Sequence, residues 1–182
     1  VRSRGLGDVY KRQDWIPPIS EYAVLPGVAA ATRVGSYTAD IRLPGGSIRG
    51  SFLAVDRSEF PQTAWFRRDL AGESLGALMN RLALDGPSVL VSEKLYTDHL
   101  LSIGDRMDVL VITDVGATVR DQFLVAGVYK HFPTVYEDEV VLVGNLDYLF
   151  SYFPIGMPHN IWMRLEPDAD GASVLASVPK AT

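Results

Sequence analysis

The chain has 182 residues, a formal net charge of −5 and no cysteine, and 47% of its residues are apolar. This length fits one domain or two small lobes, and the apolar content favours a buried core over a disordered chain. An acidic chain lacks the positive surface that phosphate backbones require, so we expect no nucleic-acid partner. Without cysteine, disulfides, thiolate nucleophiles and cysteine zinc sites are excluded.

The first thirteen residues, VRSRGLGDVYKRQ, differ from the rest of the chain because they are basic. This tract resembles translated sequencing-adapter sequence, and we interpret residues 1–13 as non-native. The alternative is a native basic arm. Either way the tract is set aside for the fold. Residues 14–182 are interpreted as a fragment of a longer protein, because the chain begins with Val1 and ends at Thr182 within an expected helix. No run approaches the ~18–20 apolar residues that a membrane span needs.

In the first half, residues 19–25 predict a short helix that ends at Pro26, and residues 28–34 predict a strand. Alternating apolar residues from Tyr37 to Leu43 indicate a second strand with one wet face, and residues 48–55 predict its hairpin partner. An irregular aromatic segment follows. The i, i+3, i+4, i+7 spacing of Leu75, Leu78, Met79 and Leu82 predicts a helix.

In the second half, residues 88–91 predict a strand, and Ser92 is expected to cap the helix that follows it. The spacing of Tyr96, Leu100 and Ile103 predicts that they line one face of this helix. A turn at residues 104–105 leads to a hairpin of two strands, 106–113 and 119–128. A short strand at 140–143, a helix capped by Asn145, a strand at 161–165 and a last helix after Asp170 complete the chain. Strands that come in hairpins as often as they alternate with helices favour an α+β fold.

Candidate chemical sites are sparse. His99, His131 and His159 are isolated from one another and lack the spacing of a zinc helix, and no serine lies in a nucleophile-elbow context. The acidic run 137–139 has carboxylates that suit calcium, but its spacing fits no calcium loop, and a solvated turn is the simpler interpretation. We expect no cofactor, no metal and no catalytic residue.

One enzymatic alternative stays open. Asp56, Trp65, Asp69 and His131 could serve a small extracytoplasmic hydrolase or a carbohydrate-binding module. This hypothesis requires the four side chains to meet in one concave pocket.

An aromatic, proline-rich segment at residues 148–158 is too irregular to be one element. Some of its aromatic rings must belong to the core. In one interpretation, all of the rings are buried there. The other interpretation is a partner surface, because large exposed apolar patches usually mark interfaces. Its members are Tyr148, Phe150, Tyr152, Phe153 and Met157.

Several ordered motifs resemble a known family. The run VLVSEKLYTDHLLSIGDRMDVLV, followed by FLVAGVYKHFP, resembles the extracytoplasmic domain of MacB/FtsX-like ABC transporter permeases. The matching residues are Val91-Ser92-Glu93, Gly104-Asp105 and Val125-Ala126-Gly127-Val128. Upstream LPGVAAATRVG and GSFLAVDRSEFP, and downstream IWMRLEPDADGASVLASV, are similar to further segments of that family. The resemblance spans roughly residues 19–178.

The resemblance implies mixed β-sheet lobes with packed helices and a small β-barrel-like hairpin region, the second lobe including residues 88–144. It also implies a non-catalytic domain outside the cell membrane, joined to transmembrane helices of its own permease. The implied partners are a cytoplasmic ABC ATPase, a second permease subunit and an envelope protein or lipoprotein substrate. ATP-driven helix motion would then be coupled to export or to an envelope partner.

Overall fold

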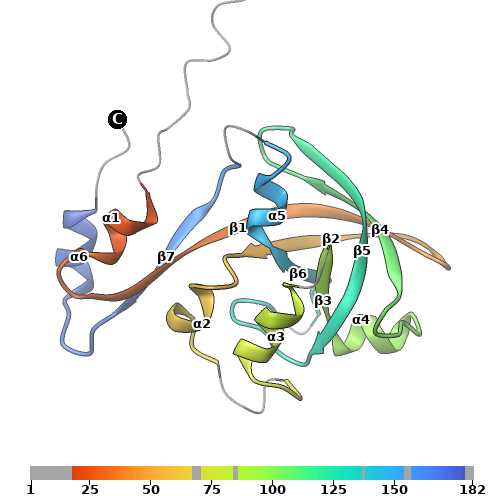
Figure 1. Ribbon diagram of the computed structural model, residues 1–182, viewed down its shortest axis with the longest axis horizontal. Helices are drawn as coiled ribbons and strands as arrows, with labels where there is room; N and C mark the ends of the chain where they lie inside the picture. The colour runs from red at the N-terminus through yellow and green to blue at the C-terminus, as the bar shows by residue number, and fades with distance from the viewer. Residues whose placement is uncertain (1–17, 67–70, 84–85, 137, 154–156, 179–182) are drawn as a thin grey trace, which may run out of the picture.

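The computed structural model describes residues 18–66, 71–83, 86–136, 138–153 and 157–178. Within them it places a seven-stranded mixed sheet in the order β2-β6-β3-β5-β4-β1-β7, and the sheet closes on itself because β1 also pairs with β2. The first six strands of that order therefore form a barrel, and β7 extends it beside β1 (Figure 1). The strands are β1 Val28–Leu43, β2 Gly46–Val55, β3 Ser88–Ser92, β4 Arg106–Ile112, β5 Thr118–Tyr129, β6 Val141–Asn145 and β7 Asn160–Leu165.

The long strand β1 joins the parts of the molecule. The sequence predicts two strands here, but the structure has a single strand of 16 residues. Its first part pairs with β7 from Val28 to Val34, and its later part pairs with β2 and β4. The predicted alternation is confirmed: Tyr37, Ala39, Ile41 and Leu43 are buried, and the residues between them lie nearer the solvent.

Six short helices cover the sheet in the described residues: α1 Ile19–Ala23, α2 Phe60–Thr63, α3 Leu75–Arg81, α4 Glu93–Asp98, α5 Leu146–Phe150 and α6 Gly171–Ser177. The predicted caps are confirmed, since Ser92 Oγ accepts the Leu95 N–H at 3.2 Å and Asn145 Oδ1 accepts the Asp147 N–H at 3.1 Å. The four-residue α2 lies in the segment for which the sequence predicts irregular structure. Proline in its first turn tolerates helical geometry because that N–H needs no partner there.

The predicted helical face of Tyr96, Leu100 and Ile103 is wrong. α4 ends at Asp98, and Leu100 takes a left-handed φ of 52°. The Leu101 N–H donates to Tyr96 O at 2.9 Å and the Leu100 N–H to Thr97 O at 3.3 Å, which is the bonding of a Schellman motif. This reversal leaves Leu100 89% exposed and turns Leu101 into the core instead.

The turn at residues 104–105 is confirmed. Gly104 has φ 101°, a conformation that costs little only for glycine. The turn is fixed to the barrel by backbone hydrogen bonds with β5, from Gly104 N to Val125 O at 2.9 Å and from Val125 N to Asp105 O at 2.8 Å.

Three apolar clusters hold the fold together. The largest contains inward residues of the barrel strands together with Leu95, Leu101, Leu146 and Leu149 from the α4 and α5 regions. A second contains the apolar residues of α2 and α3 with β2, β3 and β6. The third joins α1 and α6 to β1 and β7 through Tyr22, Val28, Ala31 and Val174. The division into two lobes stays a prediction.

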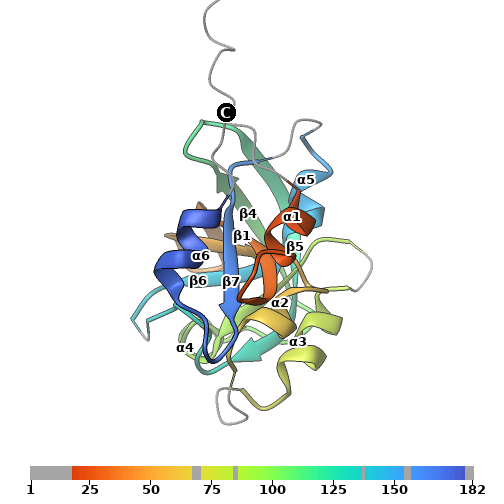
Figure 2. The same ribbon diagram turned by 90° about the vertical axis from the view of Figure 1, so that its left-hand side faces the viewer.

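Both views place α1 and α6 at the same end of the molecule (Figures 1 and 2). They flank β7 there, and their apolar residues share one cluster. The first and last helices of the described chain are therefore anchored on the same part of the sheet, away from α4.

Candidate functional site: an ion-pair cluster at the edge of the barrel

The aromatic segment singled out in the sequence lies in α5 and the residues after it. Tyr148 and Phe150 belong to α5, and Tyr152 and Phe153 follow it. Tyr152 is 46% exposed, Met157 is only 4% exposed, and the other three are half-buried. Residues 154–156 lie outside the described part of the chain. The five side chains thus do not present one exposed surface, and their role as a partner surface stays a prediction.

Two of these tyrosines hold α5 against the barrel. Asp121 on β5 accepts hydrogen bonds from Tyr148 Oη at 2.5 Å and from Tyr152 Oη at 2.7 Å. The two hydroxyl oxygens also lie 2.7 Å apart. These hydrogen bonds lower the pKa of Asp121, whereas burial and the bond to Asp121 raise the pKa of Tyr148. The contact therefore locks α5 onto β5 through a carboxylate that stays ionised.

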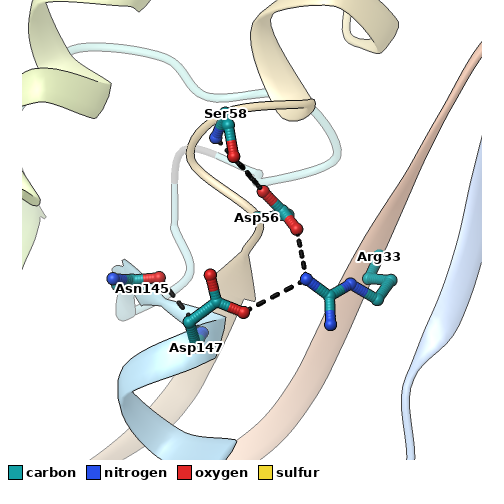
Figure 3. A network of polar contacts seen from close by, with 5 residues as sticks. All are labelled: Arg33, Asp56, Ser58, Asn145 and Asp147. Atoms are coloured by element: carbon teal, nitrogen blue, oxygen red, sulfur yellow. Dashed lines mark hydrogen bonds and ion pairs between the residues drawn. The ribbon is translucent and has the colours of Figure 1, made fainter. Parts of the chain in front are cut away.

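A second polar network lies around Arg33 of β1 and also includes a residue of α5. Figure 3 shows the Arg33 guanidinium between the carboxylates of Asp56 and Asp147. Its Nη2 donates to Asp56 in a very short contact and to Asp147 Oδ1 at 3.1 Å. Asp56 follows β2 directly, and Asp147 lies in the first turn of α5. One guanidinium therefore ties together β1, β2 and α5.

Asp56 is the most buried charge of this network, with 3% of its surface exposed. Its Oδ1 accepts hydrogen bonds from Ser58 Oγ at 2.8 Å and Ser58 N at 3.2 Å. Burial alone would raise the pKa of Asp56, but the hydrogen bonds from Arg33 and Ser58 outweigh it and hold the pKa below its ordinary value. Asp56 is thus a paired carboxylate whose ionised form is favoured.

Glu59 is the third acidic residue of the cluster, and its pKa shifts in the direction opposite to that of Asp56. Burial, and then repulsion from Asp56, raise the pKa of Glu59. Two buried polar atoms here, Arg33 Nε and Glu59 Oε2, have no hydrogen-bond partner among the described residues. Attraction to Arg33 acts in the opposite direction on the pKa of Glu59 and partly offsets the rise.

Phe150 links this cluster to β7. The Arg33 guanidinium carbon lies 5.5 Å from the centre of the Phe150 ring, and that ring lies 5.4 Å from the His159 ring. Arg33 also pairs with Ile161 of β7 in the sheet register, and Asp56 N donates to Arg33 O at 3.3 Å. The cluster consequently sits at the place where β1 passes from the barrel to the β7 extension.

The members of the enzymatic alternative are separated in the described chain. Asp56 is paired with Arg33, Trp65 is 74% exposed, and Asp69 lies outside the described residues. His131 lines a hollow of about 270 Å³ that contains neither Asp56 nor Trp65. The structure therefore gives this set no shared pocket among the residues it describes.

Other candidate ligands behave as structural groups. His159 Nδ1 lies 2.9 Å from Met157 O, and Glu139 Oε2 accepts the Tyr136 N–H at 3.1 Å. Glu137 lies outside the described residues. In the part of the chain that the structure describes, no three His, Asp or Glu side chains gather in a group that could hold a metal ion.

Comparison with solved structures identifies the fold. The periplasmic region of MacB from Actinobacillus actinomycetemcomitans matches over 96% of this chain and 77% of its own, with a TM-score of 0.53 and 13% identity. The extracellular domain of the noncanonic ABC-type transporter YknZ from Gram-positive bacteria matches over 90% and 84%, with a TM-score of 0.56 and 11% identity. The chain has the fold of a MacB-like periplasmic domain.

A domain of a putative permease from Porphyromonas gingivalis has the same MacB-like fold, over 87% of this chain and 65% of its own, with a TM-score of 0.52 and 16% identity. No family model and no curated protein matches the sequence. Among the described residues, none of the helices has the length and apolar character needed to cross a bilayer. The α+β fold with a barrel-like region, expected from the motifs, is thus confirmed.

The sequence analysis missed Arg33 and Asp147. Arg33 stands in an apolar strand, where a lone arginine is a signal that a buried or half-buried acid lies nearby. Nothing in the sequence names that acid, because Asp147 is 114 residues away.

Proposed function

We propose that this chain is a non-catalytic extracytoplasmic domain of an ABC transporter permease, and that it couples ATP-driven motion of transmembrane helices to export or to an envelope partner. The observation that carries the proposal is the MacB-like fold, matched over nearly the whole chain in domains of three transporter proteins. The proposed location is the outer side of the cell membrane.

The position of α1 and α6 supports this role. A domain that receives motion from membrane helices must be attached firmly where those helices enter. α1 and α6 lie at one end and share a buried cluster with β1 and β7. Movement of either helix therefore acts on β1, and through β1 on the barrel.

The Arg33 cluster supplies a coupling element. It joins β1, the end of β2 and α5 at the border between the β7 extension and the barrel. The proposed partners are the permease's own transmembrane helices, a cytoplasmic ATPase, a second permease subunit, and an envelope protein or lipoprotein.

The first experiment extends the parent gene in both directions. Apolar spans of ~20 residues on both flanks and a neighbouring ATPase gene are expected. Soluble flanks would reject the proposal.

The second experiment uses the full-length transporter in membranes. The double variant Arg33→Met/Asp56→Leu, which leaves neither charge buried alone, is expected to lower export while ATP hydrolysis and membrane insertion persist. The matched control is Arg49→Met, which breaks an exposed ion pair with Asp40 on the same hairpin. Equal export by both variants would contradict a coupling role for Arg33.

A further inference from the structure

A hollow opens at the end of the parallel strand pair β3 and β5. The two strands run side by side and finish together, with Ser92 opposite Tyr129 in the register. The chain then leaves in two directions, into α4 at Glu93 and into a loop from Lys130 to Tyr136. Diverging connections at the carboxyl ends of parallel strands commonly form a ligand crevice. Here the crevice has a volume of about 270 Å³.

The cations of this crevice are unpaired within the described chain. Lys94 and Lys130 line it, lie at or near the surface, and form no ion pair with the described residues. Among the described residues of the lining, Glu93 is the only acidic one, and His131 adds an imidazole. A crevice with two free ammonium groups on an otherwise acidic chain is suited to an anionic group.

The rest of the lining fits an organic ligand better than a bare ion. Val135 and Tyr136 form part of the wall, and Tyr136 is 72% exposed. Thr134, beside them, has a left-handed φ of 64°, which strains a branched residue. Strained backbone next to an exposed ring and free cations is characteristic of a binding loop.

A second charged hollow, lined by Arg42, Arg49 and Arg120 on β1, β2 and β5, lacks this property. Arg49 is paired with Asp40 at 2.8 Å, and Arg120 lies 3.8 Å from Asp108. Its cations are therefore mostly neutralised, whereas those of the β3–β5 crevice are not.

We propose that the β3–β5 crevice binds a carboxylate side chain in an acidic peptide segment of an envelope partner, with Lys94 and Lys130 pairing the carboxylate and Tyr136 contacting the neighbouring apolar residue. The inference rests on the proposed function for the source of its partner. A lipid headgroup fits less well, because α4 lies towards the opposite end of the molecule from α1 and α6 (Figure 1).

The test is a titration of the 182-residue chain with the fluorescein-labelled peptide Ser-Glu-Leu-Glu-Ser, followed by anisotropy. Binding is expected, with no binding of Ser-Gln-Leu-Gln-Ser. The double variant Lys94→Gln/Lys130→Gln is expected to weaken binding about tenfold, since each charge-assisted contact is removed without altering buried residues. Arg42→Gln removes a cation from the other hollow and should leave binding unchanged.

Three results would overturn the inference. They are equal binding of the glutamine peptide, an equal loss in Arg42→Gln, and binding of inorganic phosphate or of phosphatidylglycerol vesicles when the acidic peptide is silent. Thermal melts of all variants check that folding is intact. Because this titration needs no membrane and no ATPase, its failure is distinct from failure of the transporter proposal, which the flanking gene sequence tests.

Discussion

Arg33 and Asp56 are 23 residues apart and meet where β1 leaves the barrel for β7. Asp56 is 4% exposed at its side chain and Arg33 is 25% exposed. A pair this buried contributes less through its attraction than through the cost of leaving one partner alone. The consequences of breaking it therefore depend on which partner remains.

Replacing Asp56→Ala is expected to lower the free energy of unfolding by about 2 kcal/mol, because the Arg33 charge stays half-buried beside Phe150. Urea denaturation measures the loss. The double variant Arg33→Met/Asp56→Leu should recover most of it. A matched control, Asp40→Ala, breaks an exposed pair with Arg49 and should change stability little. Equal losses of unfolding free energy in Asp56→Ala and Asp40→Ala would show that burial of the Arg33 cluster adds nothing to the cost of breaking its ion pair.

Glu59→Gln is expected to raise the melting temperature at pH 7. Burial and repulsion from Asp56 raise the folded-state pKa of Glu59, so ionised Glu59 destabilises the folded chain. This penalty appears as pH rises above the unfolded pKa of about 4.3 and is complete above the folded pKa. The difference between variant and parent should therefore vanish near pH 4. A difference that is constant from pH 4 to pH 8 would contradict the assigned direction.

Asp56 has the opposite pH dependence. Its folded-state pKa is depressed, so its contribution is present above about pH 3.9 and is lost as pH falls through the folded value. The parent chain should thus lose stability in acid more steeply than Asp56→Asn does. Melting temperatures measured from pH 6 downward test this, and parallel curves would count against an ionised Asp56.

Tyr148→Phe is expected to cost about 1–2 kcal/mol, because it removes a half-buried hydroxyl from the Asp121 carboxylate. Combining it with Asp121→Asn should cost less than the sum, since both remove the same contact. Tyr96→Phe is the control, because the Tyr96 hydroxyl has no hydrogen bond within the described chain. Additive losses for Tyr148 and Asp121 would show that the contact does not hold α5.

Leu100→Gly and Gly104→Ala should have effects of opposite sign. Leu100 is 89% exposed in a left-handed conformation, so glycine relieves strain there and should stabilise by about 1 kcal/mol. Gly104 has φ 101° and open space where an alanine methyl group would lie, so alanine should destabilise through the backbone alone, by about 1 kcal/mol. Thermal melts compare the two.

The same melts can include an insertion after Val115, in the hairpin turn of Gly116. That turn is exposed and should accept extra residues with a smaller loss than Gly104→Val. Equal losses would contradict the contrast between a surface turn and a turn bonded to β5.

Much of the local structure could be predicted from the sequence. The caps at Ser92 and Asn145, the helix around Leu78 and the alternation from Tyr37 to Leu43 depend on neighbours within a few residues. Such patterns appear directly in the chain. The wrong prediction of a helical face at Leu100 also concerns local structure. The helix ends there in a left-handed position that glycine usually occupies, and a leucine at that position gives no signal of the helix end.

Closure of the barrel and the Arg33 cluster could not be predicted in this way. Both depend on pairings between distant segments, such as β2 with β6 and Arg33 with Asp147. Alternation fixes which side chains face the core, but it leaves the choice of neighbouring strand open. Two of the aromatic residues predicted to form a partner surface, Tyr152 and Phe150, make contacts inside the domain, at Asp121 and Arg33.

Strand β1 has a mechanical consequence. Its 16 residues span roughly 50 Å at about 3.3 Å per residue, from the α1–α6 end to the tip of the β1–β2 hairpin. A pull along this strand loads its ladders to β2 and β4 in shear, so many hydrogen bonds resist together and none opens first. The strand therefore provides a stiff connection between the α1–α6 end and the β1–β2 hairpin.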